Sequence, residues 1–184
     1  MKAGARRLAA VIDVGASAIR MDIAELAQDG RVRVLDSLYR AVALGADTFG
    51  SGRIGPGTAA ACVRILRDFR EKAEEYAGGP NFPIRIRAVG TSALREAENR
   101  EEFIDRVFIA TGIALEPIEE PEVHRLTFMA LHALLEGDSP LRRGDVLVAE
   151  VGGGGTKLLL VQDGYVTGAE TYRLGSLRVR EVLE

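Results

Sequence analysis

Two stretches of this sequence decide the fold: residues 11–20 read VIDVGASAIR, and residues 148–157 read VAEVGGGGTK. Each has an apolar run, then one acid (Asp13 or Glu150), then Val-Gly and further small residues. An apolar run of this length predicts a buried strand, and the small residues after it predict a turn. Glycines let backbone N–H groups approach an anion closely. The pattern therefore predicts two phosphate-binding loops, each with an acid that can hold a divalent cation or a water.

Each stretch belongs to three consecutive predicted strands, with a Gln-Asp-Gly turn before the third. In the first copy the strands are Leu8–Val14, Ile19–Leu26 and Arg31–Tyr39. In the second copy they are Val146–Val151, Lys157–Val161 and Tyr165–Tyr172. Because the two copies lie far apart in the chain, they suggest two related lobes rather than a solenoid of short repeats.

Helices and short strands are predicted between the copies. The Gly-rich stretch Gly45–Pro56 predicts a loop. Pro56 is a residue typical of a first helical turn, and a helix is predicted from Pro56 to about Ala77. Short strands are expected at 84–89 and 115–118. The apolar residues of the helix recur at a spacing that predicts a core-facing side, formed by Ala59, Val63, Leu66 and Phe69.

Two more helices are expected before the second copy. Asn99 and Glu102 have the spacing of a capping box, which predicts a helix that Gly112 closes. The other helix is predicted from Pro121 to Glu136. Its residues at helical spacing should face the core: Val123, Leu126, Ala130, Leu131 and Leu134.

The composition is that of an ordinary globular protein. The net charge of −3 argues against a general nucleic-acid binder, and no stretch is long and apolar enough to span a membrane. The single cysteine, Cys62, cannot form an internal disulfide, which fits a reducing, cytoplasmic location.

Four segments, in this order, carry a resemblance to a known family: DVGAS at 13–17, GTSALREAEN at 90–99, EVGGGGT at 150–156 and YRLGSLR at 172–178. The chain resembles the N-terminal part of the exopolyphosphatase/guanosine pentaphosphate phosphohydrolase (Ppx/GppA) family, of the actin–sugar kinase–Hsp70 superfamily. Any one of these motifs is weak, but the ordered set is specific.

The resemblance implies an α/β, ribonuclease-H-like (actin-like ATPase) fold with mixed sheets flanked by helices. Residues 1–118 would form the first lobe, and 119–184 the start of a second, incomplete lobe. The family hydrolyses terminal phosphoanhydride bonds of polyphosphate or of pppGpp, with Mg²⁺ or Mn²⁺, and this chemistry needs charge neutralisation and an oriented water. The resemblance implies polyphosphate or a guanosine penta- or tetraphosphate as the bound partner.

The resemblance also implies site residues. Asp13 and Glu150 would lie near the metal. Arg95 would pair with phosphate oxygens, which suits its planar guanidinium, although it could instead only cap or cover a helix. The backbone that would cradle phosphate belongs to Gly15, Ala16, Ser17, Gly152, Gly153, Gly154, Gly155 and Thr156.

The chain departs from the family pattern at several expected contacts. The position of the family's general base is Val123, which cannot take a proton from water. Glu122 could replace it, but helical geometry turns it about 100° away, which favours a first-turn carboxylate that complements the helix dipole. The acid of the second motif is Glu150 rather than aspartate, and Gly155 replaces a serine. Ala16 stands where a polar side chain is usual.

Three functions stay open on this evidence. The first is a metal-dependent phosphohydrolase, weakened by the loss of its catalytic glutamate. The second is a non-catalytic module, a pseudoenzyme, that binds phosphate, nucleotide or a protein partner. The third is an actin-like ATPase, which the Arg95 segment disfavours. The second lobe would expose apolar faces. We therefore expect either a longer protein or a partner chain, such as a second copy in a homodimer, that covers them.

Overall fold

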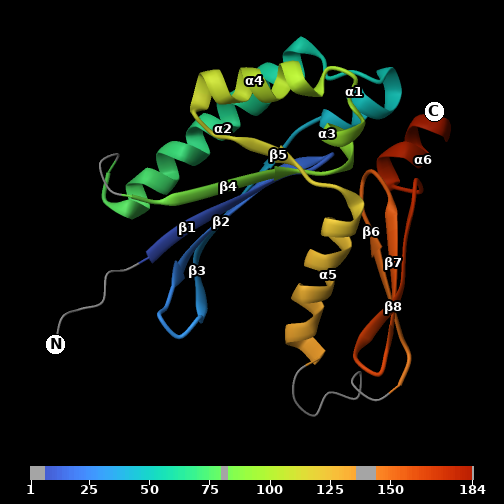
Figure 1. Ribbon diagram of the computed structural model, residues 1–184. Helices are drawn as coiled ribbons and strands as arrows, with labels where there is room; N and C mark the ends of the chain where they lie inside the picture. Colours follow the sequence, from blue (N-terminus) through green and yellow to red (C-terminus); the bar gives the residue numbers. More distant parts are fainter. Residues whose placement is uncertain (1–6, 80–82, 136–143, 184) are drawn as a thin grey trace. The chain divides into compact units, whose positions relative to one another are not determined.

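The computed structural model describes residues 7–79, 83–135 and 144–183, and the chain divides into two compact units, Met1–Pro117 and Ile118–Glu184 (Figure 1). The fold is α/β, with a mixed sheet flanked by helices in the first unit and an incomplete second lobe.

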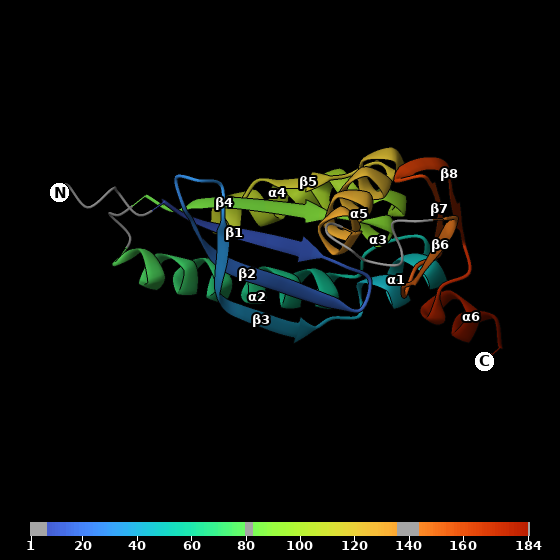
Figure 2. The same cartoon turned by 90° about the horizontal axis from the view of Figure 1, so that it is seen from below.

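The first unit is built on a five-stranded sheet in the order β3-β2-β1-β4-β5. The first three strands are consecutive and antiparallel, whereas β4 and β5 run parallel to β1. Figure 2 shows β4, β1, β2 and β3 side by side. The strands are β1 (Arg7–Val14), β2 (Ala18–Leu26), β3 (Val32–Ala41), β4 (Arg85–Gly90) and β5 (Leu115–Pro117).

The four helices of this unit are α1 (Leu44–Ser51), α2 (Pro56–Ala77), α3 (Ser92–Glu96) and α4 (Arg100–Thr111). The two long helices, α2 and α4, lie on the same face of the sheet (Figure 1). Alternate residues of β1, namely Ala10, Ile12 and Val14, are buried, as their period-2 spacing requires. The predicted extent of α2 is confirmed at both ends, and its predicted core-facing residues are all buried.

The second unit is smaller. It consists of α5 (Glu120–Leu135), the strands β6 (Val146–Val151), β7 (Thr156–Gln162) and β8 (Tyr165–Tyr172), and α6 (Ser176–Leu183). The three strands form an antiparallel sheet in sequence order. Leu159 and Val161 are fully buried within it, whereas Leu147 is 64% and Val151 70% exposed. One face of this sheet therefore leaves apolar side chains uncovered.

Two predicted features of the first unit are wrong. The predicted loop Gly45–Pro56 is mostly the helix α1, because the buried Leu44 anchors it and Gly52, at φ 76°, ends it in the left-handed region. The capping box of α4 does not form. The Asn99 side chain instead accepts from the Ile54 N–H at 2.9 Å and donates to the Ile54 carbonyl at 3.0 Å.

The prediction for the core-facing side of α5 is wrong in part. Val123 is buried, but Leu126 is 37% exposed and Ala130 is also exposed. Leu134 lies outside the residues whose side chains the structure describes. A sheet of three strands covers only a narrow stripe of a helix, so α5 buries fewer residues than its apolar periodicity predicts.

Candidate functional site

The first loop, residues 15–18, joins β1 to β2. The Gly15 N–H donates to the Ala18 carbonyl at 2.9 Å and closes the turn. The chain after β3 holds the loop from one side, because Gly45 N–H donates to the Ala16 carbonyl at 2.7 Å and Val42 N–H donates to the Ser17 carbonyl at 3.0 Å. The Ser17 N–H lies on the opposite side of its peptide from the Ala16 carbonyl, and so points away from Gly45.

The second loop, residues 152–155, joins β6 to β7 with the same turn. The Gly152 N–H donates to the Gly155 carbonyl at 2.9 Å, which is the equivalent of the Gly15 bond in the first loop. The sequence repeat is therefore also a structural repeat.

The start of α6 binds three successive carbonyl groups of the second loop. Ser176 N–H donates to Gly152 O at 3.0 Å, and Leu177 N–H to Gly153 O at 3.0 Å. Arg178 Nε donates to Gly154 O at 2.5 Å. The chain packs so closely here that a Cβ on Gly175 would overlap the carbonyl oxygen of Gly153.

This arrangement fixes the direction of two of the three N–H groups that follow these carbonyls. In a planar trans peptide the carbonyl and the following N–H point in opposite directions, so the N–H groups of Gly153 and Gly154 are directed away from the α6 N–H groups. The Gly155 nitrogen lies beside Gly175, since a Cβ on Gly175 would be 2.4 Å from it. Among the hydrogen bonds of the described residues, none of these three groups is a donor. Successive N–H groups that converge on one side form a concave anion-binding site.

Each loop has an acid on the strand before it and a base on the strand after it. Glu150 and Lys157 are direct cross-strand partners, and Lys157 Nζ lies 2.9 Å from Glu150 Oε1. Asp13 and Arg20 are the equivalent partners in the first copy, with 3.9 Å between Arg20 Nη1 and Asp13 Oδ2. The sequence analysis did not single out Arg20 or Lys157, although each follows the acid of its own stretch by the same number of residues.

The two acids do not assemble a metal site within either unit. Asp13 and Glu150 belong to different units, and each already faces a cation. Residues 7–79, 83–135 and 144–183 contain no group of three His, Cys, Asp or Glu side chains that could hold a metal ion. Mg²⁺ keeps several waters and binds through one or two carboxylates together with substrate phosphates, and Mn²⁺ also prefers oxygen ligands, so the metal role of Asp13 and Glu150 stays a prediction.

Arg95 lies at the same end of the first sheet as the first loop. It belongs to α3, which follows the last residue of β4, and that residue pairs with Val14 at the end of β1. The Thr91 N–H donates to the Val14 carbonyl at 3.4 Å. The sequence motif that contains Arg95 and the loop that contains Gly15 are thus brought together by parallel pairing of β1 and β4.

The start of α5 carries Val123, the position that the family resemblance predicts for a general base. Val123 is only 9% exposed. The neighbouring Glu122 accepts hydrogen bonds from Arg125 Nε at 2.7 Å and from Arg125 Nη2 at 2.8 Å. These bonds, and next the carboxylate charge, raise the pKa of Arg125. Because Arg125 binds both carboxylate oxygens of Glu122, the geometry favours the structural role for Glu122.

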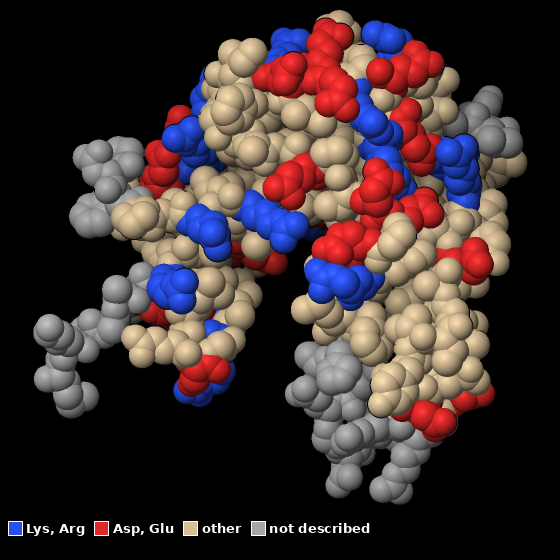
Figure 3. All heavy atoms as spheres, in the orientation of Figure 1, with Lys and Arg blue, Asp and Glu red and all other residues tan. Residues whose placement is uncertain are grey.

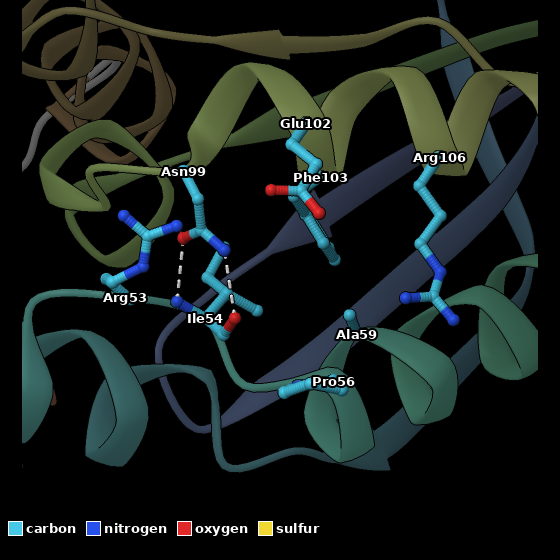
Figure 4. A pocket seen from close by; sticks show the side chains of 8 residues that line it. All are labelled: Arg53, Ile54, Pro56, Ala59, Asn99, Glu102, Phe103 and Arg106. Carbon is cyan, nitrogen blue, oxygen red and sulfur yellow. Dashed lines mark hydrogen bonds between the residues drawn. The ribbon is translucent and has the colours of Figure 1, made fainter.

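A separate pocket of about 200 Å³ lies in the first unit between the starts of α2 and α4. Figure 4 shows Arg53 and Arg106 on opposite sides of it, with Glu102 between them. The Asn99–Ile54 hydrogen bonds hold its wall. Arg53 is also paired with Glu98, with 3.3 Å between Arg53 Nη1 and Glu98 Oε2.

Charge is mixed elsewhere too. On the face shown in Figure 3, acidic and basic side chains are interspersed, without one broad basic patch of the kind that binds nucleic acid. None of the helices in the described residues is long and apolar enough to cross a membrane.

Sequence comparison relates the chain to phosphatases. The model of the Ppx/GppA phosphatase family matches residues 23–183. Exopolyphosphatase 1 of Mycobacterium tuberculosis is 26% identical over 144 residues, which cover 78% of this chain and 39% of that protein. The bifunctional 3-dehydroquinate synthase/phosphatase of Fusobacterium nucleatum is 26% identical over 181 residues, which cover 95% of this chain and 26% of that protein.

Structure comparison gives the same relationship. A Ppx/GppA family member from Aquifex aeolicus matches with a TM-score of 0.75 and 25% identity, over 96% of this chain and 54% of that one. An exopolyphosphatase from Cytophaga hutchinsonii shares the fold, with a TM-score of 0.83 and 23% identity over 96% of this chain and 53% of that one. The chain thus spans about half the length of these solved relatives.

Proposed function

The chain belongs to the Ppx/GppA phosphatase family, and on that premise we propose that its two loops bind the phosphate groups of polyphosphate or of a guanosine penta- or tetraphosphate. Hydrolysis of the terminal phosphoanhydride bond is impaired in this proposal. The two parts rest on different observations.

The observation that carries the binding proposal is the direction of the N–H groups in the second loop. The N–H groups of Gly153 and Gly154 are directed away from α6, because Ser176 and Leu177 bind the carbonyls that precede them. Phosphate oxygens are strong acceptors, and fixed backbone donors bind them without any rearrangement of side chains. In the proposal the first loop, with Gly15, Ala16 and Ser17, also binds phosphate, together with Arg95 at the same end of the sheet.

The impairment rests on the start of α5. Hydrolysis needs a group that orients and deprotonates the attacking water. Val123 has no such group, and Glu122 is engaged with Arg125. Gly155 also lacks the hydroxyl of the usual serine, and a Cβ there would meet the Tyr172 carbonyl oxygen at 2.7 Å.

These observations also favour a second candidate function, a non-catalytic module that binds phosphate chains or nucleotides. It keeps the loops and needs no base. The buried, apolar Val123 is the specific feature that favours it.

The metal, the partners and the location complete the proposal. Because Asp13 and Glu150 face cations, Mg²⁺ or Mn²⁺ enters only as a counter-ion carried by the substrate's own phosphates. The exposed apolar face with Leu147 and Val151 supports a covering chain, either further polypeptide or a second copy. The lone, buried thiol of Cys62 suits a reducing, cytoplasmic setting.

The test is an assay of binding and turnover on the full chain. Phosphate release from polyphosphate and from pppGpp is measured with Mg²⁺ or Mn²⁺, with ATP as the control substrate for an actin-like ATPase. Calorimetry measures binding of the same ligands. Binding with slow release supports the impaired phosphohydrolase, and binding with release no higher than the blank supports the non-catalytic module. Absence of binding rejects both, and release from ATP alone would favour the ATPase.

A further inference from the structure

Lys157 stands at a position where it can replace a divalent cation. We infer that this chain binds phosphate groups without a divalent metal, because Lys157 on the strand after the second loop, and Arg20 on the strand after the first, neutralise the acid beside each loop. This inference rests on the proposed function of the loops and concerns how their charge is balanced.

The charge of Glu150 makes a cation necessary. A carboxylate two residues before the glycines would repel a phosphate, since like charges at short range destabilise one another. Lys157 Nζ lies 2.9 Å from the Glu150 carboxylate and cancels this charge. The Lys157 side chain is only 22% exposed, against 47% for Glu150. The Lys157 side chain is thus the more buried of the two, and water screens its charge less than that of a fully exposed ammonium.

The Lys157 ammonium also has N–H donors beyond the one that binds Glu150. An ammonium carries three N–H donors, and the structure gives one of them to Glu150 Oε1. Thr127 of α5 donates to the other Glu150 oxygen at 3.5 Å, which helps to hold the carboxylate on the side of Lys157. Lys157 lies two residues after the loop, in the second cross-strand pair from the turn, so its remaining donors are available at the base of the same hairpin.

The same compensation occurs in the first copy. Arg20 faces Asp13 from the equivalent position, and its guanidinium also lies over the Tyr39 ring, 5.6 Å from the ring centre. Two acids at equivalent positions, each with a base at the equivalent place on the next strand, indicate that both loops balance their charge internally.

The test uses tripolyphosphate as the probe and isothermal titration of the full chain. The wild-type chain is titrated in EDTA and again in Mg²⁺. We expect binding in EDTA to be as tight as in Mg²⁺. Binding only in Mg²⁺ overturns the inference and leaves the proposed function intact, whereas binding in neither condition overturns both. This comparison needs no variant and so does not depend on a mutant's folding.

Variants then assign the charge to Lys157. Lys157→Met should weaken binding in EDTA about 10- to 100-fold, the usual effect of losing one charge-assisted hydrogen bond, while Lys157→Arg should keep most of it. Lys72→Met is the matched control. Lys72 also pairs with a glutamate, Glu75, on the surface of α2, so this substitution removes the same charge at a site away from the loops. Unchanged binding by Lys157→Met, with Lys72→Met also unchanged, overturns the role of Lys157.

The substitution Glu150→Gln distinguishes Glu150 as a metal ligand from Glu150 as the partner of Lys157. The two roles predict opposite changes in phosphate affinity. If Glu150 were a metal ligand, its loss would weaken binding in Mg²⁺. If Lys157 is the cation, Glu150→Gln releases the ammonium from its partner, and binding in EDTA becomes tighter. Weaker binding in both conditions would overturn the inference.

Discussion

The ammonium group of Lys157 and the carboxylate of Glu150 face each other at 2.9 Å across the β6–β7 hairpin, on the two strands that flank the glycine loop. Asp13 and Arg20 hold the equivalent positions across β1 and β2. The repeat in the sequence is therefore a repeat of loop geometry and also of charge: an acid before each loop and a base after it. In the proposed function the loop backbone binds phosphate, and the side chains that would carry out hydrolysis differ from the family pattern.

The missing base gives the first prediction. The substitution Val123→Glu places a carboxylate at the family's base position and should raise phosphate release from polyphosphate about 100-fold, within the usual range for a general base. Because Val123 is buried, the same change should lower the midpoint of thermal unfolding. Val123→Gln is the control, since it has nearly the same size and cannot take a proton. Equal release by the two variants would show that position 123 does not supply the base.

The pairing of Glu122 gives the second prediction. Glu122→Gln should leave any residual phosphate release unchanged, because the Glu122 carboxylate is held by two hydrogen bonds from Arg125 and does not act on water. The free energy of unfolding should fall by less than about 1 kcal/mol, as for other exposed ion pairs. A stopped assay of phosphate release and a urea titration check both points. Loss of the residual release would identify Glu122 as the base instead.

The close packing of Gly175 gives the third prediction. Gly175→Ala should displace the second loop and abolish tripolyphosphate binding, because its Cβ would overlap Gly153 O. The free energy of unfolding should fall by about 1–3 kcal/mol, the usual cost of overpacking. Gly57→Ala in α2 is the control, since a Cβ there would meet no atom within 4 Å and should be neutral or stabilising. Calorimetry and thermal unfolding of the two variants measure the difference, and wild-type binding by Gly175→Ala would contradict the loop geometry.

Much of this fold could be predicted from the sequence because its signals are local. The Gln-Asp-Gly turns fix the third strand of each copy, and Pro56 and Gly78 bracket α2. The helix α1 could not be predicted, because its Gly-rich sequence has weak helix propensity and Leu44 holds it by tertiary burial. The bond from Asn99 to Ile54 also depends on a distant segment rather than on the capping pattern beside it.

The candidate site, like the fold, could be predicted from the sequence only in part. The glycines were visible as a pattern, but their donor direction depends on which groups bind the carbonyls, and those groups come from α6. The roles of Lys157 and Arg20 depend on strand register, which pairs each base with the acid across its hairpin.

The buried thiol gives the fourth prediction. Burial and, next, the charge of Asp47 raise the pKa of Cys62 from 9.0 to about 12. The folded state therefore keeps this proton at a pH where the unfolded state loses it. The contribution of Cys62 to the free energy of unfolding should be complete below pH 9 and decrease as the pH rises from 9 towards 12, by at most about 1.4 kcal/mol per pH unit.

The reactivity of the thiol checks this account at pH 8. An aromatic disulfide reagent should label Cys62 rapidly in denaturant and very slowly in the folded chain, since the side chain is fully buried. Rapid labelling of the folded chain would show that α2 opens readily or that Cys62 is accessible.

The most direct test of phosphate binding by the loops is a nitrogen–proton correlation NMR titration of the full chain with tripolyphosphate in EDTA. The account predicts saturable shifts of the Gly153, Gly154 and Gly155 amide signals, with the Gly57 signal on α2 unchanged. If the three loop amides do not move while the ligand is at saturating concentration, the second loop does not bind phosphate and the central claim is wrong.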